Sequence, residues 1–331
     1  MPLHSLDEIE ALTRQALVAY GAAPFAAAEV ARAVRVAEGF GNKICGLYYV
    51  ESYCLQLGTG RVDGQANPVV TKPKPAVVHV DARYGFAQPA FATALIPALD
   101  AARAHGTATL AVGHAHTCTS LGYFTEQVAA AGCLCIGFTN ASPIVAAPGG
   151  KTRVIGTNPI AFSVPDGQGG IAMQFDQSTT VVALGKITMA KAMGQKIPDG
   201  WALDAAGQPT TDPDAALKGS LVSIGGYKGW GFGLMAEIFA AGMTGSVLST
   251  DVKPLKSPDG APHDLGQYYI IIDPGASDAF DARLAALTQA ATADEGARLP
   301  GQSRSIAQHV DVEDAVWERL QELVRGPKPS V

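Results

Sequence analysis

Residues 107–139, TATLAVGHAHTCTSLGYFTEQVAAAGCLCIGFT, contain two apolar runs separated by an alanine-rich run. Residues 107–112 and 134–139 predict strands, and residues 123–131 predict a helix between them. A chain in which strands alternate with helices is typical of α/β proteins. We therefore predict an α/β core built around this stretch.

The same alternation extends toward both ends of the chain. A helical period of apolar residues over 6–16 and 26–36 predicts two N-terminal helices. The proline-rich residues 67–75 and the turn-rich residues 246–266 predict connecting segments. Further predicted helices are 47–57, 89–104, 230–241, 279–291 and 312–325, and further predicted strands are 76–80, 160–164, 171–175 and 267–272.

Composition limits the classes of function. The chain has 331 residues, 47% of them hydrophobic, which is enough to bury a full core. Its 30 acidic and 24 basic residues give a formal charge of −6, so we expect no nucleic-acid partner. Residues 1–17 include acidic side chains, and no stretch of about 18 residues is continuously apolar, so we expect neither secretion nor a membrane span. Five cysteines without a C-x-x-C pair favour a reducing, cytoplasmic location.

The glycine motifs of the common nucleotide-binding folds are missing. Gly229, Gly231 and Gly233 have the wrong spacing for G-x-G-x-x-G, and they follow a lysine. A P-loop is also absent from the sequence. The sequence therefore does not support a Rossmann fold.

Three segments contain polar residues that the packing of a core does not require. Residues 156–159 (GTNP) offer donors for a phosphate or an amide, or else form a capped turn before a strand. Residues 175–180 (FDQSTT) suit either helix capping or the recognition of a ribose and a carboxamide. Residues 225–229 (GGYKG) place Lys228 at a helix start, which is typical of an anion site or of a flexible turn.

His114 and His116 stand two residues apart in an extended segment, which predicts two imidazoles on one face. Such a pair can supply a general acid or half of a metal site, or it can have a loop or core role. Because no third ligand lies nearby in the sequence, we expect no metal. Cys45 lies between apolar neighbours, where a thiol is usually a small hydrophobic side chain with a raised pKa; a reactive thiol is the alternative.

Three motifs in this order resemble one family, and the match extends from the N-terminal helices to 298–301 (RLPG). The motifs are 139–143 (TNASP) together with 148–150 (PGG), then 155–162 (IGTNPIAF), then 225–229 (GGYKG). The chain resembles the malate/L-lactate dehydrogenase-like NAD(P)-dependent oxidoreductases. Residues 84–89 (YGFAQP) resemble the branch of Δ1-piperideine-2-carboxylate and Δ1-pyrroline-2-carboxylate reductases.

The resemblance implies a fold, a cofactor and a partner. The expected fold is a non-Rossmann α/β core with a mixed sheet, similar to L-sulfolactate dehydrogenase, and the expected state is a homodimer. The expected divisions are a helical flanking domain (1–75 and 300–331), an α/β core (76–150 and 220–299) and a cofactor-binding segment with an irregular insertion (151–219). NADPH or NADH is the expected cofactor. Its implied contacts are Asn140, Gly156, Thr157, Asn158, Phe175, Ser178, Thr179, Tyr227, Lys228, Gly301, Gln302 and Ser303.

The chain departs from the family pattern at the positions where the family usually has its proton donor and its carboxylate-binding arginine. The family usually has Ser-His-Gly followed by an arginine, where this chain has Ile44, Cys45, Gly46 and then Tyr49. A second family histidine corresponds to Thr117, with His116 displaced by one position. The usual proton donor and the usual carboxylate-binding arginine are therefore missing from their places.

These departures favour an imine as the substrate. Reduction of a carbonyl needs a positioned acid, whereas a cyclic imine enters already protonated. We predict a reductase of a small cyclic imine or 2-imino acid, with Asp176, His116, Tyr49 and Cys45 as candidate catalytic residues and Lys43 and Thr117 as candidate substrate ligands. One alternative is a 2-oxo or 2-hydroxy acid dehydrogenase in which His116 takes the acid's place. Another is a cofactor-binding homologue that has lost catalysis.

Overall fold

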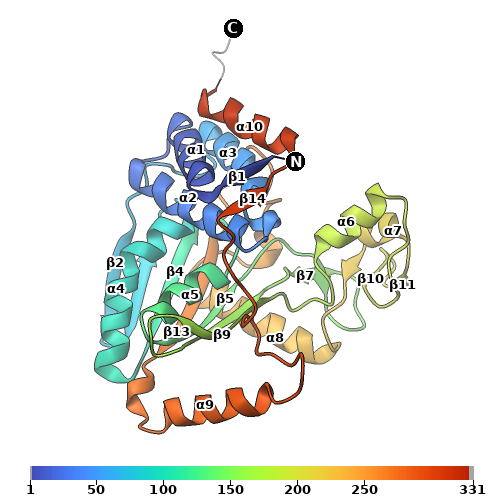
Figure 1. Ribbon diagram of the computed structural model, residues 1–331. Coiled ribbons are helices and arrows are strands. Elements are labelled where there is room, and N and C mark those ends of the chain that lie inside the picture. Colours follow the sequence, from blue (N-terminus) through green and yellow to red (C-terminus); the bar gives the residue numbers. More distant parts are fainter. Residues whose placement is uncertain (1, 328–331) are drawn as a thin grey trace.

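A seven-stranded mixed sheet forms the centre of the computed structural model, which describes residues 2–327 (Figure 1). β3 and β4 pair in parallel, and the other neighbouring strands of this sheet pair antiparallel. In spatial order the strands are β2 (Val69–Lys74), β3 (Val77–Asp81), β4 (Thr107–Ala115), β13 (Leu265–Ile272), β5 (Leu134–Thr139), β8 (Ile160–Pro165) and β9 (Ile171–Gln177).

Helices cover both faces of this sheet. α4 (Ala87–His105) and α5 (Gly122–Ala130) pack on one face, where the rings of Phe91 and Phe124 lie 5.0 Å apart. On the other face, α8 (Tyr227–Glu237) continues into a π-helical turn, Ile238–Gly242. Its Phe239 stacks on sheet residues Phe138 and Tyr268 at 4.8 and 5.1 Å. This burial of aromatic surface fixes α8 against the sheet.

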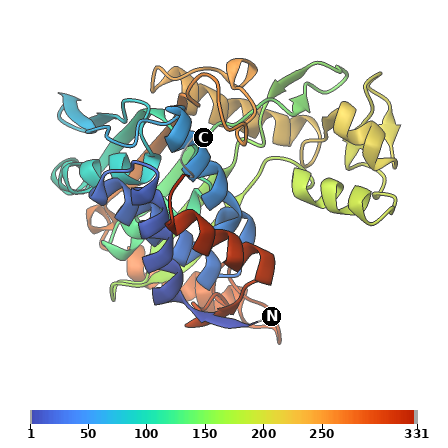
Figure 2. The ribbon, with the colours of Figure 1, turned by 90° about the horizontal axis from the view of Figure 1, so that it is seen from above.

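Segments from both chain ends build a helical layer above the sheet (Figures 1 and 2). Its strands β1 (Leu3–Ser5) and β14 (His309–Asp311) pair with each other. Two short 3₁₀ turns, Lys43–Cys45 and Leu47–Tyr49, connect its second and third helices. The helices are α1 (Leu6–Ala19), α2 (Pro24–Gly39), α3 (Val50–Thr59) and α10 (Asp314–Val324), which share one apolar core.

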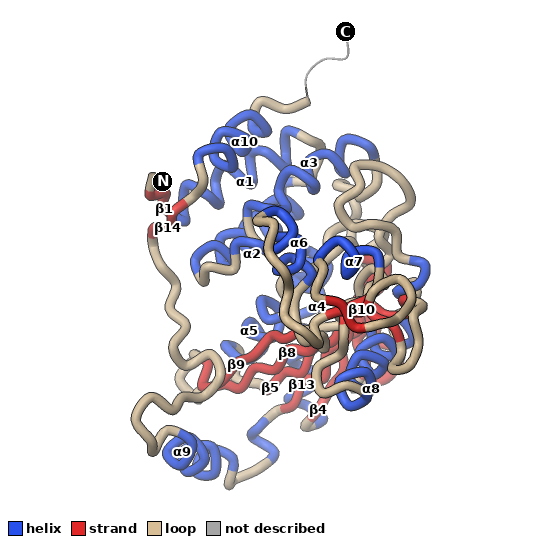
Figure 3. The backbone as a smooth tube through the Cα atoms, turned by 90° about the vertical axis from the view of Figure 1, so that its right-hand side faces the viewer, coloured by secondary structure: helices blue, strands red, loops and turns tan. Residues whose placement is uncertain are grey.

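A smaller part lies to one side of the large sheet (Figures 1 and 3). It contains a five-stranded sheet and two helices, α6 (Leu184–Ala192) and α7 (Pro213–Lys218). Its strands, in spatial order, are β11 (Pro209–Thr210), β10 (Ala202–Leu203), β12 (Ser220–Leu221), β6 (Val145–Ala146) and β7 (Arg153–Ile155). α9 (Phe280–Ala291) lies on the far side of the large sheet and buries none of its residues.

The predicted helices and strands of the core are confirmed within a few residues, and the differences have local causes. Residues 67–75, predicted as a connection, contain β2, an edge strand in which Pro73 is tolerated because one side of the strand has no partner. β8 and β9 fall in the segment 151–219 but join the large sheet. Within residues 2–327, the helices are all too short or too polar to cross a lipid bilayer.

Candidate active site

Asp176 lies near the end of the edge strand β9, where this strand meets the start of α5. Its Oδ2 accepts hydrogen bonds from the backbone N–H of Gly122 at 2.8 Å and from the Ser120 hydroxyl at 3.3 Å. Burial of the carboxyl group among protein atoms raises its pKa, and these hydrogen bonds oppose the rise. The residue as a whole keeps an exposed surface, so a small molecule can reach it.

Gly122 allows this close approach. A Cβ atom at this position would lie 2.4 Å from Nε2 of Gln174 and 3.1 Å from Cβ of Asp176. A side chain would therefore displace the amide of Gln174 and crowd the Cβ of Asp176. The glycine lets the N-terminal end of α5, with its free N–H groups, meet the Asp176 carboxylate directly.

Cys45 and Cys118 lie near enough to Asp176 to be affected by its charge, and Tyr49 lies near both thiols. Burial and then the negative charge of Asp176 raise the pKa of Cys45 to about 12. Burial also raises the pKa of Cys118, and the pKa of Tyr49 to about 12. A raised pKa favours the protonated thiol at Cys45, as its apolar neighbours indicate, and this supports the small hydrophobic side chain over the reactive thiol. None of the three groups exchanges a proton readily at neutral pH.

The two-imidazole prediction is wrong. His114 has a positive φ of 53°, which turns the backbone, and its Nδ1 lies 2.8 Å from Oδ1 of Asp264. His116 is only 1% exposed, and its Nε2 donates to Oε1 of Gln56 at 2.7 Å. Its ring stacks on His263 at 3.9 Å.

The buried ring of His116 cannot serve as the acid that the dehydrogenase alternative requires. Burial lowers its pKa well below 6.5, and the neighbouring His263 lowers it further. The structure therefore contradicts the assignment of His116 as a proton donor.

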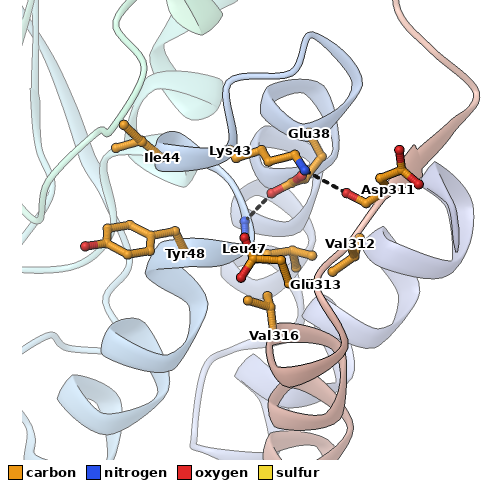
Figure 4. A pocket seen from close by; sticks show the side chains of 9 residues that line it. All are labelled: Glu38, Lys43, Ile44, Leu47, Tyr48, Asp311, Val312, Glu313 and Val316. Carbon is orange, nitrogen blue, oxygen red and sulfur yellow. Dashed lines mark hydrogen bonds between the residues drawn. The ribbon is translucent and has the colours of Figure 1, made fainter. Parts of the chain in front are cut away.

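The two candidate substrate ligands are also engaged by the protein. Lys43 Nζ donates to the backbone carbonyl of Asp311 at 2.9 Å, as Figure 4 shows. It lies beside the buried Glu38, whose Oε1 accepts from Leu47 N–H at 2.7 Å. Thr117 is buried, and its N–H donates to Nδ1 of His263 at 3.3 Å. In this structure Lys43 and the backbone of Thr117 are thus bonded within the protein, and their predicted contact with substrate stays a prediction.

Two of the predicted cofactor contacts have buried side chains. Asn140 donates from Nδ2 to the carbonyl of Val247 at 2.9 Å and accepts from Gly266 N–H at 3.3 Å. Asn158, which is fully buried, donates from Nδ2 to Oε2 of Glu237 at 2.7 Å. Glu237 also accepts from the Ser249 hydroxyl at 2.6 Å. Asn140 and Asn158 therefore fix the backbone of the site through their amide N–H groups, while Oδ1 of Asn158 is buried without a hydrogen-bond partner among the described residues.

The hydroxyl-rich segment lies beside the start of α8. Thr179 accepts from Ile224 N–H at 2.9 Å, and its own N–H and hydroxyl donate to the carbonyl of Thr157 at 2.9 and 3.0 Å. A Cβ at Gly233 would lie 3.1 Å from Thr179 Oγ1, so α8 packs directly on this segment. Predicted residues Gly156, Thr157 and Thr179 are thereby brought together; Gly156 N–H donates to Ser249 Oγ at 3.3 Å.

The first turn of α8 presents free polar groups. Gly225 and Gly226 adopt φ values of 61° and 63°, which bring the chain into the helix. Tyr227 is 71% exposed, and Lys228 beside it is also exposed. Because the first turn contains no acidic residue, the lysine and the helix N-terminus together favour an anionic group. The partly exposed Ser178 and Phe175 lie on the neighbouring segment.

The predicted C-terminal contacts lie beside Gln174, two residues before Asp176 on β9. Gln174 N–H donates to the carbonyl of Pro300 at 2.9 Å, and Gly301, with a φ of 81°, would bring a Cβ within 2.8 Å of the Gln174 carbonyl oxygen. Gln302 accepts from Leu299 N–H at 3.0 Å, which closes the turn, and Ser303 is exposed. Arg304 then pairs with Glu126, and its charge lowers the pKa of Asp176.

Sequence reasoning missed Gln56 and Lys256. Gln56 lies on α3 but is fully buried, and Lys256 Nζ lies 4.8 Å from the centre of the Tyr49 ring. Their partners are far away in the sequence, and no motif marks either residue. The one available signal was a polar glutamine among the apolar residues of 47–57.

Comparison with known proteins identifies the family. Residues 4–321 match the family described as malate/L-lactate dehydrogenase. The chain is 40% identical to (2R)-3-sulfolactate dehydrogenase (NADP⁺) of Chromohalobacter salexigens, over 91% of this chain and 90% of the relative. It is 36% identical to Δ1-pyrroline-2-carboxylate reductase of Ancylobacter novellus, over 98% of both chains.

The fold of this chain also matches the crystal structure of a reductase. Δ1-piperideine-2-carboxylate reductase from Pseudomonas syringae pv. tomato superimposes with a TM-score of 0.90 at 34% identity, over 98% of this chain and all of the other. The resemblance that the sequence motifs indicate is therefore confirmed along almost the whole chain. This protein belongs to the malate/L-lactate dehydrogenase family.

Proposed function

We propose that this protein is an NAD(P)H-dependent reductase that adds hydride to the C=N bond of a small cyclic 2-imino acid. The observation that carries the proposal is the chemistry around Asp176. The Asp176 carboxyl group lies near Cys45 and Cys118, Tyr49 lies near these two thiols, and burial raises the pKa of all three groups. This arrangement suits a substrate that brings its own proton, because the site offers a fixed negative charge and weak acids only.

The protonated imine meets this requirement. Its nitrogen carries the proton and the positive charge, and hydride addition at the neighbouring carbon gives a neutral amine without a proton transfer in that step. The Asp176 carboxylate stabilises and orients the iminium group, and the N–H of Gly122 and the hydroxyl of Ser120 hold this carboxylate in place. A carbonyl substrate would instead leave an alkoxide that needs a donor.

The residues present fit a nicotinamide dinucleotide. Lys228 and the N-terminal N–H groups of α8 would hold a phosphate, and the partly exposed Ser178 and Phe175 would contact the ribose and the nicotinamide side. The turn at Gly301, Gln302 and Ser303 would cover the opposite side of Asp176. When bound, the nicotinamide supplies the hydride. Both NADPH and NADH are compatible with this set of residues.

Two further proposals concern the setting of the enzyme. Ile224, Phe232 and Ile238 are large apolar side chains that remain exposed in and next to α8, which supports a homodimer that covers them.

The five cysteines are all free, which supports a reducing, cytoplasmic location.

A second candidate is the oxidation of a 2-hydroxy acid or the reduction of a 2-oxo acid. The 40% identity to a sulfolactate dehydrogenase favours it. This reaction needs a group that exchanges a proton with the substrate oxygen, and in this chain Tyr49 would have to do so with a pKa of about 12. Oxidation of a hydroxy acid, which needs the deprotonated tyrosine, would therefore be fastest at alkaline pH, whereas reduction of an oxo acid would not be.

One experiment separates these proposals. The purified protein is mixed with NADPH or NADH and with Δ1-pyrroline-2-carboxylate, Δ1-piperideine-2-carboxylate or 2-oxo acids, and the loss of reduced cofactor is followed. Oxidation by the imines and not by oxo acids supports the imine reductase. Oxidation by oxo acids alone supports the dehydrogenase. Tight cofactor binding without turnover of either class indicates a homologue that has lost catalysis.

A further inference from the structure

A cavity of about 310 Å³ lies over β2, β3 and β4, toward the edge of the large sheet that is opposite to Asp176 on β9. The pairing of these three strands places two rows of residues on its floor. One row is Thr71, His79 and Ala111, and the next row is Val69, Asp81 and Gly113. Because β4 contributes only an alanine and a glycine, the floor is lowest over β4, and the larger side chains of β2 and β3 stand beside it.

The covering of this sheet face stops at the cavity. The π-helical turn after α8 covers the middle of the sheet, where Ala111 belongs to one apolar cluster with Phe138 and Tyr268. The chain then passes Gly113, where a Cβ atom would lie 2.7 Å from the carbonyl oxygen of Thr244. Thr244 therefore forms the wall on the side of α8, and the polar residues of β2 and β3 stay partly or fully exposed.

Two residues of opposite charge, Asp81 and Arg83, line this cavity. Among residues 2–327, neither side chain takes part in an ion pair. Oδ1 of Asp81 accepts a hydrogen bond from the backbone N–H of Arg83 at 2.8 Å, and a φ of 53° at Arg83 turns the chain directly after β3. Isolated surface charges are usually only solvated, but these two border one hollow. The guanidinium group and the second carboxylate oxygen are thus left for a ligand.

The backbone beside these charges has an uncommon conformation. Of the six non-glycine residues with positive φ in the described part of the chain, four lie here: Arg83, Tyr84, His114 and Asp264. Nδ1 of His114 lies 2.8 Å from Oδ1 of Asp264, and the carbonyl of His114 accepts from Tyr84 N–H at 2.8 Å. Non-glycine residues in this conformation cost energy and persist only where the surrounding contacts impose them. These contacts fix His114, which lines the cavity, before any ligand arrives.

We infer that this cavity binds a free α-amino acid, with its carboxylate on Arg83 and its ammonium group on Asp81. A simple anion would be repelled by Asp81 and a simple cation by Arg83, so the two residues together favour a molecule that carries both charges. The imidazoles of His79 and His114 add nitrogens that can form hydrogen bonds. Ligand sites usually have volumes of about 300–1,000 Å³, so a cavity of this size suits a small molecule.

The cavity is separate from the candidate active site. β2 and β9 form opposite edges of the seven-stranded sheet, with five strands between them. An amino acid in the cavity therefore leaves the surroundings of Asp176 open to the imine and the nicotinamide. The proposed reduction of a 2-imino acid yields an α-amino acid, so its product belongs to the inferred class of ligand. The inference goes beyond the proposed function and does not need it, because the charges of Asp81 and Arg83 are present with or without turnover.

The test follows the ring signals of His79 and His114 in NMR spectra of the full chain during titration with L-proline. The variants His79→Asn and His114→Asn identify these signals by their loss. We expect L-proline to shift both signals to saturation, whereas binding at Asp176 on the other edge of the sheet would leave them in place. L-Prolinamide, which lacks the carboxylate, and cyclopentanecarboxylate, which lacks the ammonium group, should each bind roughly 10- to 100-fold more weakly, because one charged hydrogen bond is lost.

Variants assign each charge of the ligand to its partner. Arg83→Met should weaken the binding of L-proline by roughly 10- to 100-fold and should not weaken that of L-prolinamide. Asp81→Asn, whose amide oxygen can still accept from Arg83 N–H, should weaken L-proline and not cyclopentanecarboxylate. Lys72→Met, an exposed residue of β2 outside the cavity lining, is the matched control and should bind like the unchanged protein. A thermal melt of each variant verifies that it is folded.

The same titrations can overturn the inference. Histidine signals that do not move with L-proline would show that the cavity takes no amino acid. Equal affinity of Arg83→Met or Asp81→Asn and the unchanged protein for L-proline would remove that residue from the site. Cyclopentanecarboxylate or L-prolinamide binding as tightly as L-proline would indicate a site for a simple anion or a simple cation. Because imine reduction plays no part in these measurements, they remain decisive if the proposed function fails.

Discussion

The Asp176 carboxylate and the Gly122 backbone N–H are 2.8 Å apart, and this hydrogen bond joins the end of the outermost sheet strand to the first turn of α5. The aspartate therefore caps a helix and also presents a charge to the site. A structural role and a chemical role must be separated by experiment, because removal of the side chain would affect both.

Asp176→Asn separates the two roles. The amide oxygen can still accept from Gly122, so we expect a folded protein whose melting temperature changes little. Loss of the negative charge should lower kcat with Δ1-pyrroline-2-carboxylate by about 100-fold, the usual size of an electrostatic contribution of this kind. Steady-state kinetics and a thermal melt provide the measurements. Asp278→Asn, an exposed site next to α9, is the control, and a fully active Asp176→Asn variant would remove Asp176 from the mechanism.

Lys228 should act on the cofactor and not on the imine. We expect Lys228→Met to weaken NADPH or NADH binding about tenfold, because one charged contact with a phosphate is lost. The KM of the imine at saturating cofactor should be unchanged. Titration of the fluorescence of the reduced cofactor measures the binding, with Lys74→Met on the distant strand β2 as control. Unchanged cofactor affinity would show that the lysine is simply solvated.

Asn158 should contribute to stability. Asn158→Ala removes a donor to Glu237 and places alanine at a φ of 38°, which asparagine tolerates better than alanine does. We expect the free energy of unfolding to fall by about 2–3 kcal/mol, because the buried Glu237 oxygen loses a partner. Urea unfolding measures the change, and Asn67→Ala at an exposed position should have almost no effect. A loss below about 0.5 kcal/mol would contradict the role given to this network.

Acidification should destabilise the protein through His263. Burial lowers its pKa in the folded state to about 3, against 6.5 for the ordinary group. Between these values the unfolded chain binds one proton more than the folded one, so the free energy of unfolding falls as the pH falls, by about 1.4 kcal/mol per pH unit. This stability is fully present above about pH 6.5.

His263→Asn should remove the contribution of one proton from the slope of the free energy of unfolding against pH, which is about 1.4 kcal/mol per pH unit. Urea unfolding from pH 7.5 to pH 5 measures the slope. His309→Asn, which replaces an exposed histidine, should keep the slope of the unchanged protein. Equal slopes of the free energy of unfolding against pH for His263→Asn and the unchanged protein would contradict a lowered pKa of His263 in the folded state.

The sequence predicts well what depends on local periodicity. The alternating apolar runs place β4, α5 and β5 within three residues at each end, because burial on a sheet face imposes a regular pattern. Of the predicted motifs, Gly301 lies against Gln174 on β9, and Thr179 lies three residues after Asp176 and bonds Thr157. These segments are recognisable because turns and helix starts need particular residue types.

The roles of single polar side chains were harder to predict, because their partners are distant in the chain. Gln56 bonds His116, 60 positions away, and it bonds Leu255 at a separation of 199. The backbone turn at His114 also removes the strand geometry on which the paired-imidazole prediction depended. Asn158 has the composition expected of a ligand-binding turn, and only its full burial assigns it to the support of α8.

The pairing of Leu3 with Asp311 has a consequence for synthesis on the ribosome. The turn that carries Cys45 and Tyr49 is held by the hydrogen bond from Lys43 to the carbonyl of Asp311. Residues of α10 complete the apolar core on which this turn packs. A nascent chain that has already formed the central sheet still lacks the contacts of this turn with Asp311 and α10 until residue 324 has been synthesised. The turn that carries Cys45 and Tyr49 therefore gains its contacts with Asp311 and α10 only after the central sheet has been synthesised.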